Sequence, residues 1–133
     1  MAEISEELDR LSCELIGEAI ARLESKAGLP VLLACDAETD LFAFEDDTPD
    51  GCYRAACQKV AELGAACTRY AIAFDGTIQE AEDEPAMPAI IIEFAERDGG
   101  PAWSGYLLYR RAKDGSIEVT DPQPAGAEEP LFA

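Results

Sequence analysis

Histidine is absent from this chain of 133 residues. Because histidine is the usual general base near neutral pH and the commonest metal ligand, its absence excludes catalysis by Ser-His-Asp and Cys-His arrangements. The glycine-rich patterns that bind phosphate groups, G-x-x-x-x-G-K-S/T and G-x-G-x-x-G, are also missing from the sequence. The sequence therefore predicts no catalytic residue, no cofactor and no metal site.

Long apolar runs are missing as well, since no stretch of about 18 apolar residues is long enough to cross a bilayer. The first residues, 1–7, are acidic, whereas a signal peptide begins with a basic segment. The cysteines are odd in number and lack C-x-x-C spacing, which fits neither a disulfide framework nor a zinc site. We therefore expect a cytoplasmic protein in which five thiols are reduced, those of Cys13, Cys35, Cys52, Cys57 and Cys67.

Basic residues are scarce, with 10 Lys and Arg against 28 Asp and Glu and a net charge of −18. Such a charge repels nucleic acid and anionic membranes, so direct binding to either is not expected. It favours a basic protein partner instead. The alternative explanation is a strongly solvated surface that keeps the protein soluble, for example in a salty cytoplasm, since arginine outnumbers lysine.

Two segments concentrate the acidic residues. Residues 36–50 contain seven carboxylates and residues 80–84 contain four, and neither segment contains a lysine or an arginine. Within the first segment, Asp46, Asp47 and Asp50 form a candidate acidic interaction loop. Mimicry of nucleic acid is an alternative function, but it needs carboxylates spaced along one face like phosphates, and two separate loops do not supply that regularity.

The spacing of apolar residues changes along the chain. Between Ile4 and Leu23 they recur every three or four residues, which predicts an amphipathic helix. Short apolar runs at 31–35 and 41–44 predict a strand hairpin. A second helix is expected at 50–64, capped by its aspartate. Its predicted inner stripe consists of Tyr53, Ala56, Cys57, Val60 and Leu63.

From residue 68 onward the apolar period becomes two, which is typical of half-buried strands. Four strands are expected, at 70–74, 89–95, 103–110 and 116–120. The order α-β-β-α-β-β-β-β predicts an α+β fold, with an antiparallel sheet and both helices packed on one face. We expect one domain at 1–120 and a Pro-containing acidic tail at 121–133, too rich in proline for a central strand.

Two dipeptides, Asp75-Gly76 and Asp114-Gly115, have the residue types of tight hairpin turns. A two-residue loop at the second of these places Arg111 opposite Glu118 on the facing strand. We therefore predict an exposed cross-strand ion pair between those two side chains.

A candidate ligand or partner site is predicted on the open face of the sheet. Glu93 and Glu96 lie in the most apolar strand, where a carboxylate needs a polar partner. Arg97 follows directly, and the next strand carries Tyr109 and Arg110. The alternative interpretation is a structural ion pair between strands, because such pairs also hold buried carboxylates without performing chemistry.

Four motifs of the second half of the chain carry a resemblance to known proteins. They are Tyr70-Ala71-Ile72-Ala73-Phe74-Asp75-Gly76, Ala89-Ile90-Ile91-Ile92-Glu93, Glu96-Arg97 and Leu107-Leu108-Tyr109-Arg110. Over residues 30–112 the chain resembles small bacterial cytosolic proteins of uncharacterised function. The resemblance implies a bacterial cytosolic origin and assigns no catalytic residue.

The preferred hypothesis from these features is a non-enzymatic acidic protein-interaction domain, an accessory or inhibitor protein whose acidic loops meet a basic surface. The alternative from another class is a small-molecule-binding protein or enzyme that uses the polar residues of the sheet face. A deep pocket on that face would favour the alternative.

Overall fold

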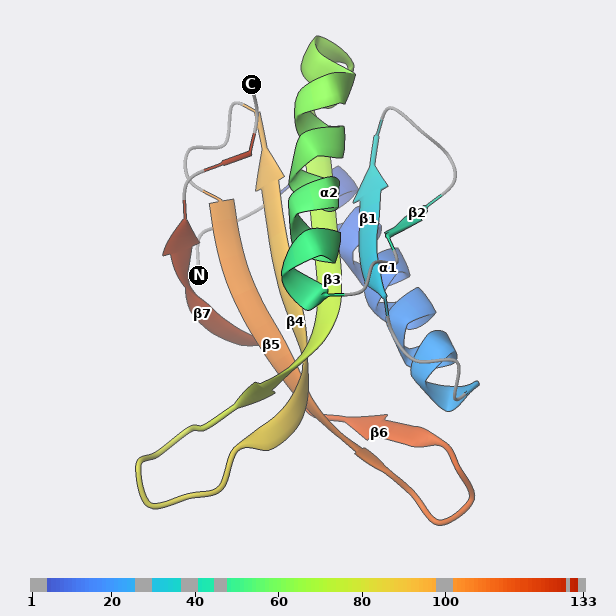
Figure 1. Ribbon diagram of the computed structural model, residues 1–133, viewed down its shortest axis with the longest axis vertical. Coiled ribbons are helices and arrows are strands. Elements are labelled where there is room, and N and C mark those ends of the chain that lie inside the picture. Colours follow the sequence, from blue (N-terminus) through green and yellow to red (C-terminus); the bar gives the residue numbers. More distant parts are fainter. Residues whose placement is uncertain are drawn as a thin grey trace.

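The computed structural model describes residues 5–25, 30–36, 41–44, 48–97, 102–128 and 130–131. Within these residues the chain forms two α-helices and an open antiparallel sheet of seven strands, which confirms the α+β class (Figure 1). In chain order the elements are α1 (Glu6–Glu24), β1 (Val31–Cys35), β2 (Phe42–Phe44), α2 (Pro49–Leu63), the 3-10 helix η1 (Gly64–Ala66), β3 (Arg69–Ile78), β4 (Met87–Glu96), β5 (Ala102–Arg111), β6 (Ile117–Val119) and β7 (Gln123–Glu128).

Neighbouring strands of the sheet run antiparallel in the order β2-β1-β3-β4-β5. The outer edge of β5 is shared, because β7 pairs with its first half and β6 with its last residues. The hairpins β3-β4 and β5-β6 diverge at one end of the molecule, opposite the end at which α2 terminates (Figure 1). No helix in the described part of the chain is long and apolar enough to cross a membrane.

Both helices begin at hydroxyl caps. Ser5 caps α1, because its hydroxyl oxygen accepts a hydrogen bond of 3.1 Å from the amide of Leu8. Thr48 caps α2 in the same way, with a bond of 3.0 Å from the amide of Gly51. Asp50, expected as the cap, lies instead in the first turn of α2, where its charge suits the helix dipole.

The helices lie on opposite faces of the sheet, and the expectation that both pack on one face is wrong. Leu32 and Ala34 of β1 belong to the core that includes α1. Val31, Leu33 and Cys35 alternate with them and belong to the second core, which includes α2. Figure 1 shows α2 in front of the sheet and α1 behind it. The continuous apolar run of β1 is typical of a strand that is buried on both faces.

The β5-β6 turn is one residue longer than expected. Ala112 and Ser116 close a three-residue loop, with a hydrogen bond of 2.8 Å from the amide of Ala112 to the carbonyl of Ser116. Gly115 has a φ of 90° in this loop, as the third position of such hairpins requires. Arg110, and not Arg111, therefore stands opposite Glu118 and forms the ion pair, at 2.6 Å.

The other predicted turn, at Asp75-Gly76, does not occur. Both residues continue β3, which extends to Ile78 and faces Met87 at the start of β4. A Cβ on Gly76 would lie 3.1 Å from the side chain of Ile91, so glycine here permits close cross-strand packing. The β3-β4 hairpin is therefore longer than the sequence predicted, and its loop lies further from the core.

Part of the predicted tail forms a strand. Residues 123–128 are β7, which pairs antiparallel with β5. The register shifts between Ser104 and Gly105, where Pro124 lies opposite. Proline has no amide hydrogen to donate, and it is tolerated here because β7 lies at the edge of the sheet beside an irregularity. Further on, the amide of Leu131 donates to the hydroxyl of Tyr70, at 3.1 Å.

Candidate functional site

The five residues of the predicted sheet-face site do not come together. Glu96 contacts the start of α1, while Glu93 and Arg97 lie on the side of the sheet that α2 covers. Tyr109 donates a hydrogen bond to Asp75 on the α1 side. Arg110 pairs with Glu118 on the exposed β5-β6 hairpin. These positions follow from the strand pleat, because successive side chains point to opposite faces.

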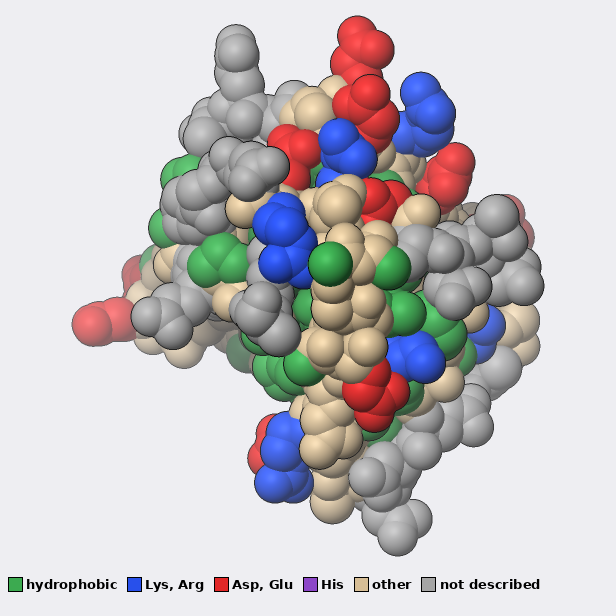
Figure 2. Space-filling view, turned by 90° about the horizontal axis from the view of Figure 1, so that it is seen from above, with side chains coloured by type: hydrophobic (Ala, Val, Ile, Leu, Met, Phe, Trp, Pro, Cys, Tyr) green, Lys and Arg blue, Asp and Glu red, His purple; other side chains and the backbone are tan. Residues whose placement is uncertain are grey.

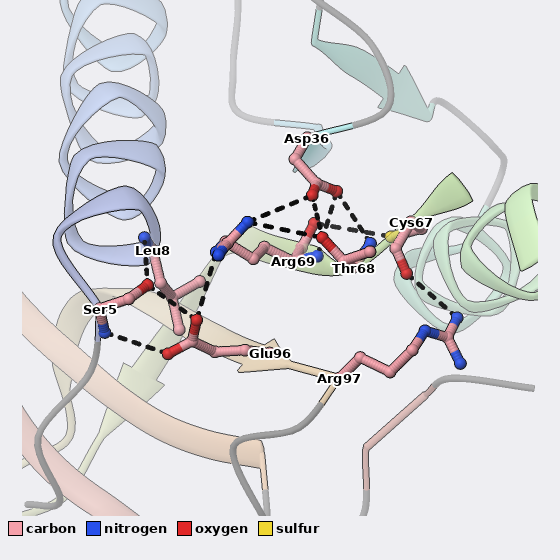
Figure 3. A network of polar contacts seen from close by, with 8 residues as sticks. All are labelled: Ser5, Leu8, Asp36, Cys67, Thr68, Arg69, Glu96 and Arg97. Carbon is pink, nitrogen blue, oxygen red and sulfur yellow. Dashed lines mark hydrogen bonds and ion pairs between the residues drawn. The ribbon is translucent and has the colours of Figure 1, made fainter. Parts of the chain in front are cut away.

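Glu96 connects the end of β4 to the start of α1 (Figure 3). Its carboxylate accepts hydrogen bonds from the amide of Ser5, at 3.0 Å, and from the hydroxyl of Ser5, at 2.7 Å. The guanidinium Nε of Arg69 donates to the same carboxylate at 3.2 Å. Burial raises the pKa of Glu96, but the bonds from Ser5 and Arg69 outweigh that effect, and the net result is a pKa below its usual value.

Asp36 forms the second half of this network. It accepts hydrogen bonds from the amides of Thr68 and Arg69, at 2.9 and 3.1 Å, and a further one from the Thr68 hydroxyl. Arg69 also approaches it through Nη1, at 3.5 Å. Burial raises the pKa of Asp36, and the hydrogen bonds lower it by more, so the carboxylate form is favoured. Figure 3 shows Arg69 between Asp36 and Glu96, in an arrangement that holds four elements together.

Arg97 binds backbone carbonyls at the C-terminal end of α2. Its Nη2 donates to the carbonyls of Gly64 and Cys67, at 2.8 and 3.1 Å. Carbonyls at a helix C-terminus lack partners within the helix, and a cation there also complements the helix dipole. Arg97 is therefore a structural residue, and the 3-10 turn η1 is fixed by it.

Glu93 is buried on the α2 side of the sheet, and its hydrogen bond comes from a helix. It is 8% exposed, and the hydroxyl of Tyr53 donates to its Oε1 at 2.5 Å. Ser104, also buried, stands opposite on β5. The ring of Tyr53 contacts Phe74 edge-on, with ring centres 5.7 Å apart. Strand periodicity predicted that Glu93 needs a partner, but the partner comes from α2, where Tyr53 belongs to the predicted inner stripe.

Burial lowers the reactivity of three of the five cysteines. The structure places none of the five in a disulfide. Burial raises the pKa of Cys67 to about 12, and Cys35 and Asp36 nearby add to the effect. Burial also raises the pKa of Cys57 and of Cys13. Because the thiolate is the nucleophile, these thiols are poorly suited to covalent chemistry. Within the described residues, no group of three His, Cys, Asp or Glu side chains is arranged to hold a metal ion.

The structure describes one of the two acidic segments in part and the other in full. Asp46 and Asp47 lie outside the described residues, and Asp50 is exposed at the start of α2. Residues 80–84 are fully described and lie in the loop between β3 and β4, which we call the acidic β3-β4 loop. Its carboxylates are exposed, and it projects from the end of the molecule opposite the C-terminus of α2 (Figure 1).

The acidic β3-β4 loop has a defined shape. The side-chain amide of Gln79 donates to the carbonyls of Glu82 and Glu84, at 3.1 and 2.8 Å. Glu80 accepts a hydrogen bond of 2.9 Å from the hydroxyl of Tyr106 on β5. These bonds use backbone carbonyls and one carboxylate, so the carboxylates of Glu82, Asp83 and Glu84 are left facing solvent. The loop therefore presents three charges from a fixed backbone.

The opposite end of the molecule carries a mixture of acidic and basic side chains. Figure 2 views the end at which α2 terminates, and there the acidic and basic side chains of the described residues are interspersed. Arg69 neutralises part of the acidic charge within the network of Figure 3. Among the described segments the acidic β3-β4 loop is thus a distinct, single-signed feature.

Comparison with known proteins adds no assignment. No family model, no curated protein and no solved structure matches the chain.

Proposed function

We propose that this protein is a non-enzymatic acidic interaction domain, an accessory or inhibitor protein of the bacterial cytosol that binds a basic protein surface. The observation that carries this proposal is the acidic β3-β4 loop, whose exposed carboxylates project on a hairpin from a body with a net charge of −18. A concentrated charge of one sign raises the association rate with an oppositely charged partner.

The two alternatives have less support. A small-molecule site on the sheet face was expected to combine five polar residues, and the structure places them on both faces and at both ends of the sheet. Nucleic-acid mimicry needs carboxylates repeated along one face at the spacing of phosphates. The described carboxylates of 80–84 lie instead in a single loop.

The test is capture of a partner from a bacterial lysate at low ionic strength, followed by measurement of the association rate with the purified partner. We expect a basic protein, and an association rate that falls with added salt because surface charges are screened beyond about 8 Å at physiological ionic strength. The variant Glu82→Gln, Asp83→Asn, Glu84→Gln should associate roughly tenfold more slowly at low salt.

The matched control removes the same number of charges elsewhere. Glu7, Glu14 and Glu62 are exposed on the two helices, and their replacement by glutamine should leave the association rate close to that of the parent protein. Capture of no basic protein would overturn the proposal. A complex that is equally indifferent to salt and to the loop variant would also overturn it.

A further inference from the structure

Five apolar residues form a strip on the α2 side of the sheet, at the end that carries the β3-β4 loop. It consists of Ile78, Met87, Ile91, Tyr106 and Leu108. Residues opposite one another in antiparallel strands point to the same side, and the register pairs Ile78 with Met87 and Ile91 with Tyr106. Met87 is 41% exposed and the other four are half-buried. We call these five residues the apolar strip.

No described helix covers the apolar strip. On this side of the sheet α2 packs mainly against β1 and β2, and its Tyr53 reaches Phe74 of β3 and Glu93 of β4. The strip lies further along β3, β4 and β5, toward the acidic β3-β4 loop. Figure 1 shows the lower end of α2 ending above the region where the β3-β4 hairpin leaves the body. A partly exposed group of large apolar side chains on a strongly charged protein is typical of a surface that meets another molecule.

The apolar strip adjoins the acidic β3-β4 loop. Tyr106 belongs to the strip, and its hydroxyl donates to Glu80 of the loop at 2.9 Å. Glu82, Asp83 and Glu84 follow within four residues along the same loop. The combined surface is therefore apolar in the middle and negative at its edge. Its chemical complement is a segment with apolar side chains on one face and lysine or arginine beside them.

The net charge of the protein also distinguishes between two possible occupants of this surface, a second copy of the chain and a basic partner. A second copy of this chain would bring another net charge of −18 against the same acidic loop, and like charges oppose such an approach. We propose that the apolar strip and the acidic β3-β4 loop together form the docking surface for a basic amphipathic segment of another protein. This inference rests on the proposed function and adds the place and the kind of segment bound.

Methyl NMR provides a direct test. Met87 is one of two methionines in the chain, so its ¹³C-methyl signal is easily assigned by its loss in Met87→Ala. The probe is a synthetic peptide in which leucine and lysine are arranged as an amphipathic helix. We expect the Met87 signal to shift and saturate during titration with this peptide. A scrambled peptide of the same composition should bind more weakly and shift the signal little.

Two substitutions, one on each face of the sheet, test which face binds the peptide. Met87→Gln should weaken binding of the amphipathic peptide about three- to tenfold, because one large apolar contact is lost. Val119→Gln is the matched control, since Val119 is 38% exposed but pairs with Tyr109, which packs on the α1 side. It should leave the affinity unchanged.

Three results would overturn this inference. Equal binding of both peptides without a shift of the Met87 signal would show attraction by charge alone, and the proposed function would then stand without the docking surface. Equal losses in Met87→Gln and Val119→Gln would show that the strip is not the contact. A Met87 shift that depends on protein concentration without peptide would identify a second copy as the occupant.

Discussion

Arg69 lies between two carboxylates that come from separate strands, Asp36 after β1 and Glu96 at the end of β4. Each carboxylate also accepts hydrogen bonds from other groups, so the ion pairs are part of a network and not isolated surface contacts. A network of this kind ties α1 to three strands. Its contribution to the free energy of unfolding depends on both carboxylates being ionised.

We predict that Glu96→Gln lowers the free energy of unfolding at neutral pH by about 1–3 kcal/mol, because hydrogen bonds to a charged acceptor are lost. The pKa of Glu96 in the folded protein lies below its unfolded value of about 4.3. Its stabilisation is therefore complete above that value and is lost as the pH falls through the folded pKa. The difference between the variant and the parent protein should shrink in acid.

Urea denaturation across the acid range measures both quantities. Glu14→Gln, at an exposed position of α1, is the control and should change the free energy of unfolding little at any pH. If the gap between Glu96→Gln and the parent protein stays constant as the pH falls, the ionised carboxylate is not the source of the stabilisation.

At this scale the sequence identified which residues need partners but not what the partners are. Glu93 and Glu96 lie in an apolar strand, and a buried carboxylate there requires a hydrogen bond. Their partners, Tyr53 and Ser5, are 40 and 91 residues away along the chain. Only the packing of the helices on the sheet determines such contacts, and strand periodicity carries no information about it.

Among the elements, helices and strands were predicted where the apolar period was clear. The helix 6–24 and the four later strands are examples. The sides on which the helices lie were not, although the unbroken apolar run of β1 already indicated burial on both faces. Turn positions were the least predictable, because Asp-Gly is also compatible with a longer loop, as at Gly115, or with a continuing strand, as at Gly76.

Two glycines provide opposite tests of these elements. Gly115 has a positive φ of 90°, a region in which a Cβ is strained, so Gly115→Ala should lower the free energy of unfolding by about 1–2 kcal/mol. Gly17 lies inside α1, and a Cβ added there would meet no atom within 4 Å, so Gly17→Ala should raise the free energy of unfolding by about 0.5–1 kcal/mol.

Denaturation of both variants under one set of conditions makes each the control for the other. An alanine at position 115 that leaves the free energy of unfolding unchanged would contradict the three-residue loop with its left-handed glycine. An alanine at position 17 that destabilises the protein would show that this position of α1 packs against something.

At the scale of the whole molecule, the net charge of −18 acts on both folding and binding. Like charges repel one another more strongly in the compact state than in the extended chain, so the charge opposes folding. The same charge attracts a basic partner. Salt screens both interactions, and its effects on the free energy of unfolding and on association should therefore have opposite signs.

We predict that the midpoint of thermal unfolding rises as the salt concentration increases from about 0.01 M to about 1 M, a range in which the Debye length falls from about 30 Å to about 3 Å. Over the same range, association with the captured basic partner should slow. The network around Arg69 is partly shielded from solvent and is screened less than the exposed carboxylates, so the relief of repulsion dominates. A surface that serves solubility alone predicts the first effect without the second. A midpoint that falls with salt would show instead that ion pairs contribute more to the free energy of folding than repulsion does.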